Sequence, residues 1–328
     1  MTADLQQSAE IAASSWPQIT GRPELVMQRE NIVFRVQTLE GDCALRLHRP
    51  GYRSREQLQS ELAWMSMLAA AGMDIPAPLP AADASFLVEG DRAASLLKWL
   101  PGIPLGRAGQ PLDIAGATRN ELFRSIGRTM ATVHDLSDLW PLPAGFSRPR
   151  WDRDGLVGEK PLWGRFWEAD IAAEDRVLFL RVRDHARELL AGMQADIGLI
   201  HADLVRENML VQGDTVRFID FDDSGFGYRI FDLATALLQN INEPDYAELQ
   251  AALCEGYAER RSLPDIGLLP LFLVLRALTY VGWAADRMSE PAIAGRMPTY
   301  LATSRKLIEL VLPDLAPRGN AATHARGG

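Results

Sequence analysis

Cysteine is scarce in this sequence, which holds only two in 328 residues, Cys43 and Cys254. The two lie far apart and have no metal-ligand spacing, which argues against both a disulfide framework and a structural zinc site. Such low cysteine use fits the reducing cytosol. We therefore expect a cytoplasmic protein.

Long apolar runs and basic runs are also missing. Residues 1–16 lack the basic and apolar regions of a secretory leader, and no uninterrupted apolar stretch of membrane-spanning length follows. The formal net charge is −9, and no run of Lys and Arg could neutralise a phosphate backbone. We therefore expect a soluble protein that binds neither membranes nor nucleic acid and acts on a small molecule. The oligomeric state stays open.

The glycine motifs that cradle phosphates are absent as well. The sequence contains no G-x-x-x-x-G-K-[ST], which excludes a P-loop enzyme, and no G-x-G-x-x-G. Any nucleotide therefore has to be covered by a glycine-poor turn.

The sequence does hold enough apolar material, 47% of its residues, for one large or two modest domains. Apolar and polar residues alternate over 25–47, which predicts an antiparallel hairpin or meander. Residues 54–72 have helical spacing and begin with Ser54, a good N-cap. Residues 85–100 predict another hairpin, and the Pro- and Gly-rich residues 101–112 predict a crossing segment.

The pattern beyond this crossing segment is helical. It contains one β interruption, residues 207–223, which predicts a hairpin with its turn at Gly213 and Asp214. We therefore predict an α+β fold with a small antiparallel β lobe that carries one main helix (1–100), a larger mainly helical lobe (101–315) and a disordered tail (316–328). The expected helices of the larger lobe are 119–136, 174–193, 232–241, 246–261 and 268–288.

Polar residues interrupt the apolar stretch "LIHADLVRENMLV" at residues 199–211. His201, Asp203, Leu204 and Asn208 have the spacing of the kinase catalytic loop H-R-D-L-x-x-x-N, and Asp220 stands where the kinase pattern places its metal aspartate. In phosphoryl transfer, divalent cations neutralise the phosphate charge while a base relieves the attacking hydroxyl of its proton. The spacing predicts Asp203 as the base, Asn208 and Asp220 as Mg²⁺ ligands, and His201 as a brace for the loop.

With these residues, the sequence resembles the aminoglycoside phosphotransferase and choline kinase superfamily over nearly its whole length. The blocks "LIHADLVRENMLV", "FIDFDDSGFGYRIFDLATAL" and "LRLHRPGYRSREQLQSELAWMSML" are most similar to the type II homoserine kinase and stress-response kinase branch. The resemblance implies a two-lobed, protein-kinase-like fold that binds ATP and Mg²⁺. It also implies that Asp232 anchors the catalytic segment to the following helix.

The small lobe departs from the family pattern at one position. The lysine that holds the nucleotide phosphates is replaced by Arg46, with Glu61 as its natural partner. Arginine stays cationic and can grip phosphate with two nitrogens, but its planar head is not equivalent to an ammonium group. An ordinary ion pair between Arg46 and Glu61 is the alternative.

Two other segments are assigned to the nucleotide by their position in the family. The glycine-poor turn "QRENIVFRV" places Glu30, Asn31 and Ile32 near the phosphates. The segment "LLKWLPG" places Lys98, Trp99 and Leu100 at the adenine, through their backbone groups.

Several residues keep two interpretations. Asp222 and Asp223 form either a solvated turn, which turn preferences favour, or a second metal shell, and Glu207 is similar. Two further sets are left open. Trp140, Trp151, Trp163 and Trp167 form a substrate lid or core, and Arg276, Tyr280, Trp283 and Arg287 form core or a pocket wall.

We predict that the acceptor is a small alcohol that carries an amine. Only a short segment separates Asp220 from Asp232, too short for the long activation loop of a protein kinase. Acidic residues around the transfer site would attract an ammonium group. The alternatives are a Ser/Thr protein kinase of the stress-response type and a nucleotide-binding module that lost catalysis through the change to Arg46.

Overall fold

The computed structural model describes residues 3–29, 31–193 and 196–315. Glu30 and the predicted disordered tail 316–328 lie outside these ranges. The chain forms two compact units, one of Met1–Pro149 with Ile197–Pro264 and one of Arg150–Asp196 with Asp265–Gly328. This division differs from a boundary at residue 100, so the lobe limits given above stay a prediction.

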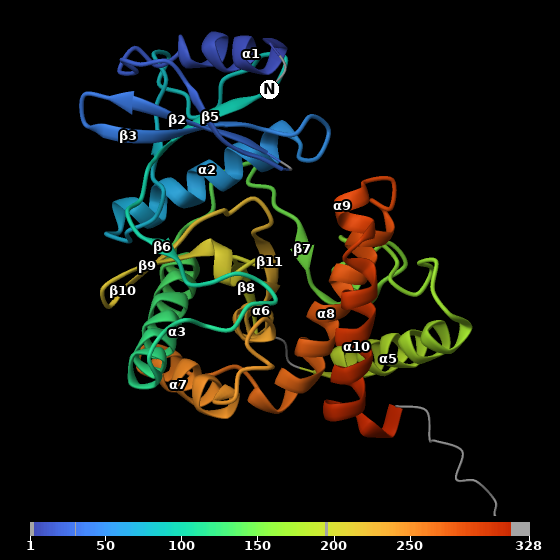
Figure 1. Ribbon diagram of the computed structural model, residues 1–328. Helices are drawn as coiled ribbons and strands as arrows, with labels where there is room; N and C mark the ends of the chain where they lie inside the picture. Colours follow the sequence, from blue (N-terminus) through green and yellow to red (C-terminus); the bar gives the residue numbers. More distant parts are fainter. Residues whose placement is uncertain (1–2, 30, 194–195, 316–328) are drawn as a thin grey trace, which may run out of the picture. The chain divides into compact units, whose positions relative to one another are not determined.

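The first unit begins with a five-stranded antiparallel sheet in the order β1-β2-β3-β5-β4. Its apolar face, with Phe34, Leu45 and Leu96, packs against α1 (Ala3–Ala13). Strand side chains alternate between faces, so Arg46 points to the opposite face, where α2 (Arg55–Ala70) lies (Figure 1). The strands are β1 (Glu24–Gln28), β2 (Ile32–Thr38), β3 (Gly41–Leu47), β4 (Pro78–Leu79) and β5 (Ala94–Lys98).

Helix α2 begins where the sequence predicts. The Ser54 hydroxyl accepts a hydrogen bond from the Gln57 amide, and the Gln57 side chain accepts one from the Ser54 amide, which completes a capping box. Gly72 follows the helix with a φ of +90°, a left-handed conformation that glycine adopts without steric cost. The cap fixes the start of the helix that carries Glu61.

The hairpin predicted for residues 85–100 is only half correct. Its second arm is β5, but its first arm is reduced to an isolated bridge between Val88 and Ala94. Ser85 instead donates from its amide and its hydroxyl to the Asp83 carboxylate. Such local side-chain bonds compete with a strand ladder.

The rest of the first unit joins two short sheets to three helices. Strands β8 (Ile197–Ile200) and β11 (Gly225–Tyr228) pair antiparallel. The predicted hairpin is confirmed, with Gly213 at a φ of +59° in its turn. It consists of β9 (Met209–Gln212) and β10 (Thr215–Phe218), β9 also pairs with β6 (Ile103–Pro104), and the short helix η1 (Arg206–Asn208) precedes it.

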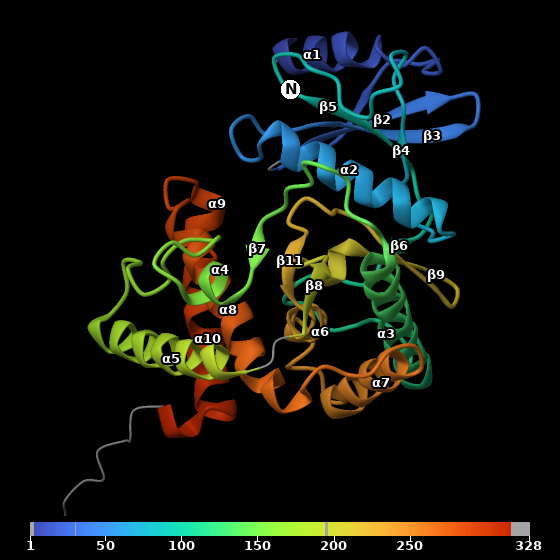
Figure 2. The same cartoon turned by 180° about the vertical axis from the view of Figure 1, so that it is seen from behind.

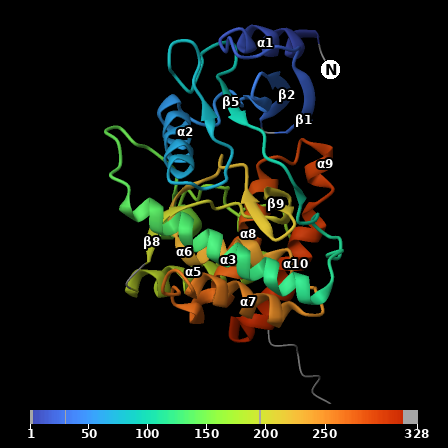
Figure 3. The same cartoon turned by 90° about the vertical axis from the view of Figure 1, so that its left-hand side faces the viewer.

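Helices α3 (Gly116–Leu139) and α7 (Tyr246–Ala258) run side by side in this unit (Figure 3). Two glycines allow their backbones to approach closely. A Cβ atom on Gly127 would lie 2.1 Å from the Leu253 carbonyl oxygen, and one on Gly256 would lie 1.9 Å from that of Arg124. Helix α6 (Arg229–Leu238) packs against this pair and against strands β8 and β11, and it is buried along its whole length (Figure 2).

The second unit is almost entirely helical. Helices α8 and α10 pack together, and Trp151, Trp163 and Trp167 are buried in this unit, which identifies these tryptophans as core. Residues Ile266–Ala285 are long and apolar enough to cross a membrane, but 67% of the apolar window is buried, as in a core helix of a soluble protein. The elements are β7 (Arg150–Trp151), α4 (Arg153–Val157), α5 (Ala173–Gly192), η2 (Ile266–Leu268), α8 (Leu269–Ala285), α9 (Pro291–Ala294), α10 (Met297–Val311) and η3 (Pro313–Leu315).

Candidate active site

The segment between β8 and β9 carries the predicted catalytic loop, and Asp232 in the first turn of α6 holds its start. The Asp232 carboxylate accepts hydrogen bonds from the backbone amides of His201, at 2.9 Å, and Ala202, at 2.7 Å. Ala202 has a φ of +66°, a strained conformation for a residue with a Cβ atom. His134 also contacts this carboxylate at 3.1 Å. Asp232 thus fixes the loop in a shape that it would not adopt alone.

His201 connects the catalytic loop to the end of β10. The Asp203 amide donates to Nδ1, so Nε2 carries the proton and donates to the Ile219 carbonyl at 3.0 Å. Burial lowers the pKa of His201, which keeps the ring neutral at physiological pH. These contacts join the catalytic loop to the end of β10, and the role of His201 as a brace stays a prediction.

Asp203 and Asn208 are brought together by the turn of η1. The Asn208 amide nitrogen donates to the backbone carbonyl and to a carboxylate oxygen of Asp203, both at 2.9 Å. Because the nitrogen is used in this way, the amide oxygen of Asn208 is the atom left to bind a cation. The Ile219 amide donates to the Asn208 carbonyl at 3.0 Å, which ties this loop to the residue before Asp220.

Asp220 follows β10 and has a φ of +65°. Solvent reaches its side chain, but protein groups crowd it. Burial and the nearby charges of Asp222 and Asp203 raise its pKa to about 8, and the Arg46 charge opposes this rise. Burial and the Asp222 charge act on the same carboxylate, and both disfavour its ionised form.

The interpretation of Asp222 and Asp223 as a solvated turn is wrong in one respect. The residues do form a turn, but Asp222 is buried, with 6% of its surface exposed. Burial and the carboxylates of Glu61 and Asp223 raise the pKa of Asp222 to about 6. The Asp223 carboxylate is held by Arg53 at 2.7 Å, so neither side chain is simply solvated.

Glu207 binds the crossing segment. One of its carboxylate oxygens accepts a hydrogen bond from the Ala108 amide at 2.8 Å, which fastens the crossing segment to the catalytic loop. Its contact is therefore structural.

The predicted pair of Arg46 and Glu61 is present and buried, with 2.6 Å between Arg46 Nη2 and Glu61 Oε1. Among the described residues, no group accepts a hydrogen bond from the buried Arg46 Nε. A buried donor of this kind is costly unless a ligand completes it, so Arg46 retains hydrogen-bonding capacity for phosphate.

The two other segments assigned to the nucleotide are the turn at Asn31 and the end of β5. The Asn31 side chain lies between β1 and β2 and accepts from the Arg49 amide at 3.1 Å. At the end of β5, the amides of Lys98 and Trp99 already donate to the Ala77 and Asp42 carbonyls. This leaves the amide of the buried Leu100 as the donor of this segment that is best suited to adenine.

The sequence does not predict three residues that contact the site: Tyr52, Arg53 and Arg148. Tyr52 and Arg53 lie just before α2 and bind Asp223. Arg148 is buried and contacts both α2 and the loop after Asp220. Tyr52 and Arg53 lie in the third block of the family resemblance, which assigns them no role, and Arg148 belongs to no periodic pattern or motif. Ser54 beside Arg53 predicts the α2 cap, but no nearby residue predicts that Arg53 binds Asp223.

The second unit holds the four residues that the sequence leaves open as core or pocket wall. Arg276, Tyr280 and Trp283 lie on α8, and Arg287 follows its end. The Arg276 guanidinium lies 4.7 Å from the Trp163 ring centre and 4.4 Å from that of Tyr280. Arg276 is buried, and Arg287 lies 4.8 Å from the ring centre of Trp283. Trp140 lies in the first unit, where its ring contacts that of Phe146.

The residues present suit a divalent cation that also binds phosphate. Within the described ranges, no three His, Cys, Asp or Glu side chains form a metal cluster. Mg²⁺ needs only one or two protein oxygen ligands when waters and phosphates supply the rest. Asp220 and the Asn208 oxygen meet that need, and the crowding of carboxylates around Asp220 favours a cation electrostatically.

The α+β fold brings together the predicted base, the two predicted oxygen ligands and a buried arginine next to a helix glutamate, as expected for a kinase-like phosphotransferase. The profile of the phosphotransferase enzyme family matches residues 24–265, which include all of these groups. The chain belongs to the phosphotransferase enzyme family.

Three comparisons describe its position in the family. The structure is similar to that of a microcompartment-associated aminopropanol kinase, with a TM-score of 0.79, 28% identity, and coverage of 94% of this chain and 98% of that one. It shares the fold of an amicoumacin kinase solved with AMP-PNP, Ca²⁺ and Ami, with a TM-score of 0.73, 18% identity, and coverage of 97% and 98%. Homoserine kinase of Agrobacterium fabrum is 29% identical over 254 residues, 75% of this chain and 73% of that protein.

These comparisons confirm the predicted kinase-like fold and the predicted activity of a kinase acting on an alcohol group. The protein is a kinase-type phosphotransferase, similar to kinases that are named for small molecules. The amicoumacin kinase that shares its fold was solved with AMP-PNP and Ca²⁺. The roles of the individual site residues stay predictions.

Proposed function

We propose that this enzyme transfers the γ-phosphate of Mg²⁺-bound ATP to the hydroxyl of a small amino alcohol or hydroxy amino acid in the cytoplasm. The observation that supports this most strongly is the pairing of Asn208 with Asp203. The Asn208 nitrogen orients the Asp203 carboxylate, and its oxygen faces away as a cation ligand. One turn thus combines a base and a metal ligand.

In the proposed mechanism, Asp203 accepts the proton of the acceptor hydroxyl as the oxygen attacks the γ-phosphate. Asn208 and Asp220 hold the cation, which when bound supplies positive charge against the phosphate oxygens. Arg46 binds the phosphates, with Glu61 fixing its guanidinium. The backbone at Asn31 covers the phosphates, and the backbone from Lys98 to Leu100 binds adenine.

Two observations support a small acceptor. Strand β11 begins at Gly225 and leads directly into α6 at Arg229, which leaves no room for an extended activation segment. Relatives named for aminopropanol and homoserine act on small molecules that carry both a hydroxyl and an amine. The acidic groups Asp203, Asp220 and Asp222 would attract such an amine.

The test is phosphate transfer from γ-labelled ATP to three acceptor classes in parallel: amino alcohols, hydroxy amino acids and generic protein substrates. We expect a labelled small-molecule product that requires Mg²⁺. Protein labelling without a small-molecule product would favour the stress-response alternative. ATP binding without transfer to any class would favour a nucleotide-binding module.

A further inference from the structure

The loop Asp220–Ser224, here called the metal loop, carries the predicted cation ligand Asp220. It lies between β10 and β11 and has no regular structure. Asp220 at its start has a φ of +65°, which persists in a non-glycine residue only when surrounding contacts fix it. The groups that hold this loop therefore control where the Asp220 carboxylate lies.

Arg148 holds the metal loop from one side. Its Nη2 donates to the carbonyls of Asp222, at 2.7 Å, and Phe221, at 3.1 Å, and to the Ser224 hydroxyl at 2.9 Å. Its Nε donates to the Ser224 carbonyl at 2.8 Å. Three of the five N–H groups of this arginine, those on Nε and Nη2, are thus directed at one loop.

Arg148 also reaches α2. Its Nη1 donates to the Gln57 carbonyl at 2.9 Å and lies 3.5 Å from Glu61 Oε2. Glu61 is the partner of Arg46. One buried guanidinium therefore joins the metal loop to the helix that orients the phosphate-binding arginine.

Arg53 holds the same loop from the small-lobe side. Its Nε donates to the Asp222 carbonyl at 3.2 Å, and its Nη2 contacts the Asp223 carboxylate at 2.7 Å. The Tyr52 hydroxyl donates to the same carboxylate at 3.0 Å. The Asp222 carbonyl therefore accepts from two arginines that are distant in the sequence.

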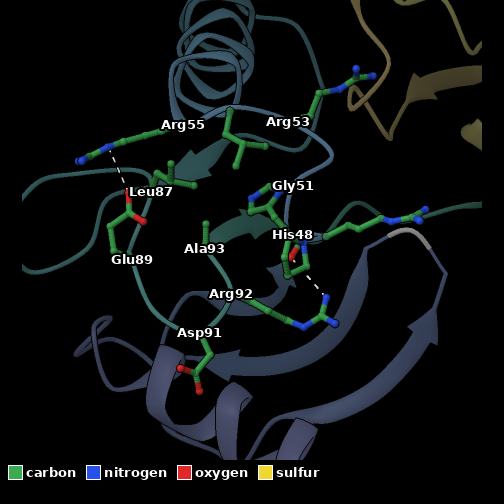
Figure 4. A pocket seen from close by; sticks show the side chains of 12 residues that line it. His48, Gly51, Arg53, Arg55, Leu87, Glu89, Asp91, Arg92 and Ala93 are labelled. Atoms are coloured by element: carbon green, nitrogen blue, oxygen red, sulfur yellow. Dashed lines mark hydrogen bonds and ion pairs between the residues drawn. The ribbon is translucent and has the colours of Figure 1, made fainter. Parts of the chain in front are cut away.

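Arg53 is also one of the residues that line a pocket of about 160 Å³ near the start of α2. Figure 4 shows that Arg53 and Arg55 leave this pocket in different directions, with Arg55 directed to Glu89. The Arg55 pair is exposed and lies 3.1 Å apart. Arg55 therefore offers a matched control for Arg53, with the same charge only two positions away.

We propose that Arg53 and Arg148 are positioning residues that set the affinity of the site for the divalent cation. They hold the backbone of the metal loop so that the Asp220 carboxylate is placed for the cation before the nucleotide arrives. This inference rests on the proposed function, because it takes Asp220 as a cation ligand. Neither arginine needs to touch the nucleotide.

The test measures binding of ADP by calorimetry across a series of Mg²⁺ concentrations, for the wild type and for Arg53→Gln, Arg53→Lys and Arg55→Gln. Loss of a charge-assisted hydrogen bond corresponds to roughly a 10-fold or larger effect. We expect Arg53→Gln to raise the Mg²⁺ concentration for half-maximal enhancement of ADP binding about 10-fold, and to leave ADP binding without Mg²⁺ unchanged. The Mg²⁺ midpoint of Arg53→Lys should lie between those of the wild type and Arg53→Gln. The midpoint of Arg55→Gln should equal that of the wild type.

Two outcomes would overturn the proposal. One is an equal Mg²⁺ midpoint for Arg53→Gln and Arg55→Gln. The other is a loss of ADP affinity by Arg53→Gln that is the same with and without Mg²⁺, which is the result for a purely structural residue. Arg148→Lys provides a second arm, and if it does not fold, the Arg53 variants still decide the question.

Failure of the proposed function has a different result in the same experiment. In that case ADP binding to the wild type would not depend on Mg²⁺ at all, and the inference about the arginines would fall with it. A Mg²⁺-dependent wild type with an unaffected Arg53→Gln would contradict only the inference.

Discussion

The catalytic segment His201–Asp232 and the nucleotide side of the same unit are held together in different ways. In the catalytic segment, some contacts join residues of the segment itself: Asn208 binds Asp203 five residues away, and Asp232 binds His201 from 31 residues away. The contacts from the nucleotide side come from residues far along the chain: Arg53 binds Asp223 of the catalytic segment from 170 residues away, and Arg148 binds Asp222 from 74. The contacts within the catalytic segment belong to one continuous motif. The contacts from the nucleotide side join residues that only the fold brings together.

This contrast indicates which residues of the site can be substituted without loss of function. A base and its neighbouring metal ligand need fixed relative positions, which a single turn supplies at fixed spacing. A cationic side chain that binds phosphate can reach the site from another part of the chain. An arginine keeps the charge of the lysine that it replaces, and it needs a buried partner to orient its planar head. Arg46 has such a partner in Glu61.

The largest effect should come from the catalytic segment. We expect Asp203→Asn to lower kcat by about 10² to 10⁴-fold, the range of general-base catalysis, with nearly unchanged binding of Mg·ATP. Single-turnover phosphate transfer and calorimetry measure the two quantities. Asp214→Asn, in the hairpin turn, is the control for loss of a carboxylate charge, and turnover retained by Asp203→Asn would remove this residue from the mechanism.

Asp220→Asn should abolish most of the thermal stabilisation that Mg²⁺ adds to ATP binding, because the anionic cation ligand is lost. Thermal denaturation with ATP, with and without Mg²⁺, measures this effect. An unchanged Mg²⁺-dependent rise in Tm would place the cation elsewhere, with Asp222 as the next candidate.

Without metal, Asp220→Asn should stabilise the folded protein, which is the opposite of its effect with Mg·ATP. The size of this stabilisation should depend on pH. The folded protein raises the pKa of Asp220 to about 8, above the value of about 3.9 for an unfolded aspartate. This residue therefore favours the fold at low pH and loses that contribution as the pH rises from about 4 to 8. In metal-free buffer, Asp220→Asn should be more stable than the wild type at pH 8, and the difference should shrink toward pH 5. A Tm difference independent of pH would contradict the raised pKa.

On the nucleotide side, Arg46→Met should weaken ATP binding by roughly 10-fold, since a charge-assisted phosphate contact is lost. Arg46→Lys should recover part of this affinity, because it keeps the charge beside Glu61. Calorimetric titration with ATP distinguishes the two variants. Equal affinity of Arg46→Met and the wild type would reduce the pair to an ordinary ion pair.

The smallest effect should come from Tyr52→Phe. The variant removes one hydrogen bond to Asp223 while Arg53 keeps its own, so we expect the Mg²⁺ midpoint to rise about 5-fold, equivalent to about 1 kcal/mol. An effect larger than that of Arg53→Gln would mean that the hydroxyl, not the arginine, holds the metal loop.

This contrast also explains what could be predicted from the sequence. The spacing of Asp203, Asn208 and Asp220 predicted residues that the structure places in one site, because each is fixed by a nearby turn. The α2 cap and the hairpin at Gly213 followed from local rules as well.

The missed features all depend on distant partners. No local pattern indicates that Arg148 binds carbonyls of the metal loop, since any arginine can bind any backbone carbonyl that the fold brings near. The residue type of Asp222 favours turns and so predicts a solvated side chain, but the structure buries this side chain. The first arm of the hairpin at 85–100 failed because Asp83 and Ser85 bond locally.

Phosphorylation of a small molecule with Asp203 as the base is tested most directly by ³¹P NMR. The wild type and Asp203→Asn are each incubated with Mg·ATP and an equimolar panel of amino alcohols and hydroxy amino acids. We predict one new phosphomonoester for each ADP formed with the wild type, and none on the same time scale with Asp203→Asn. ATP consumption that yields only inorganic phosphate, or an equal rate in the variant, would contradict the assignment of this chain as a small-molecule kinase with Asp203 as its base.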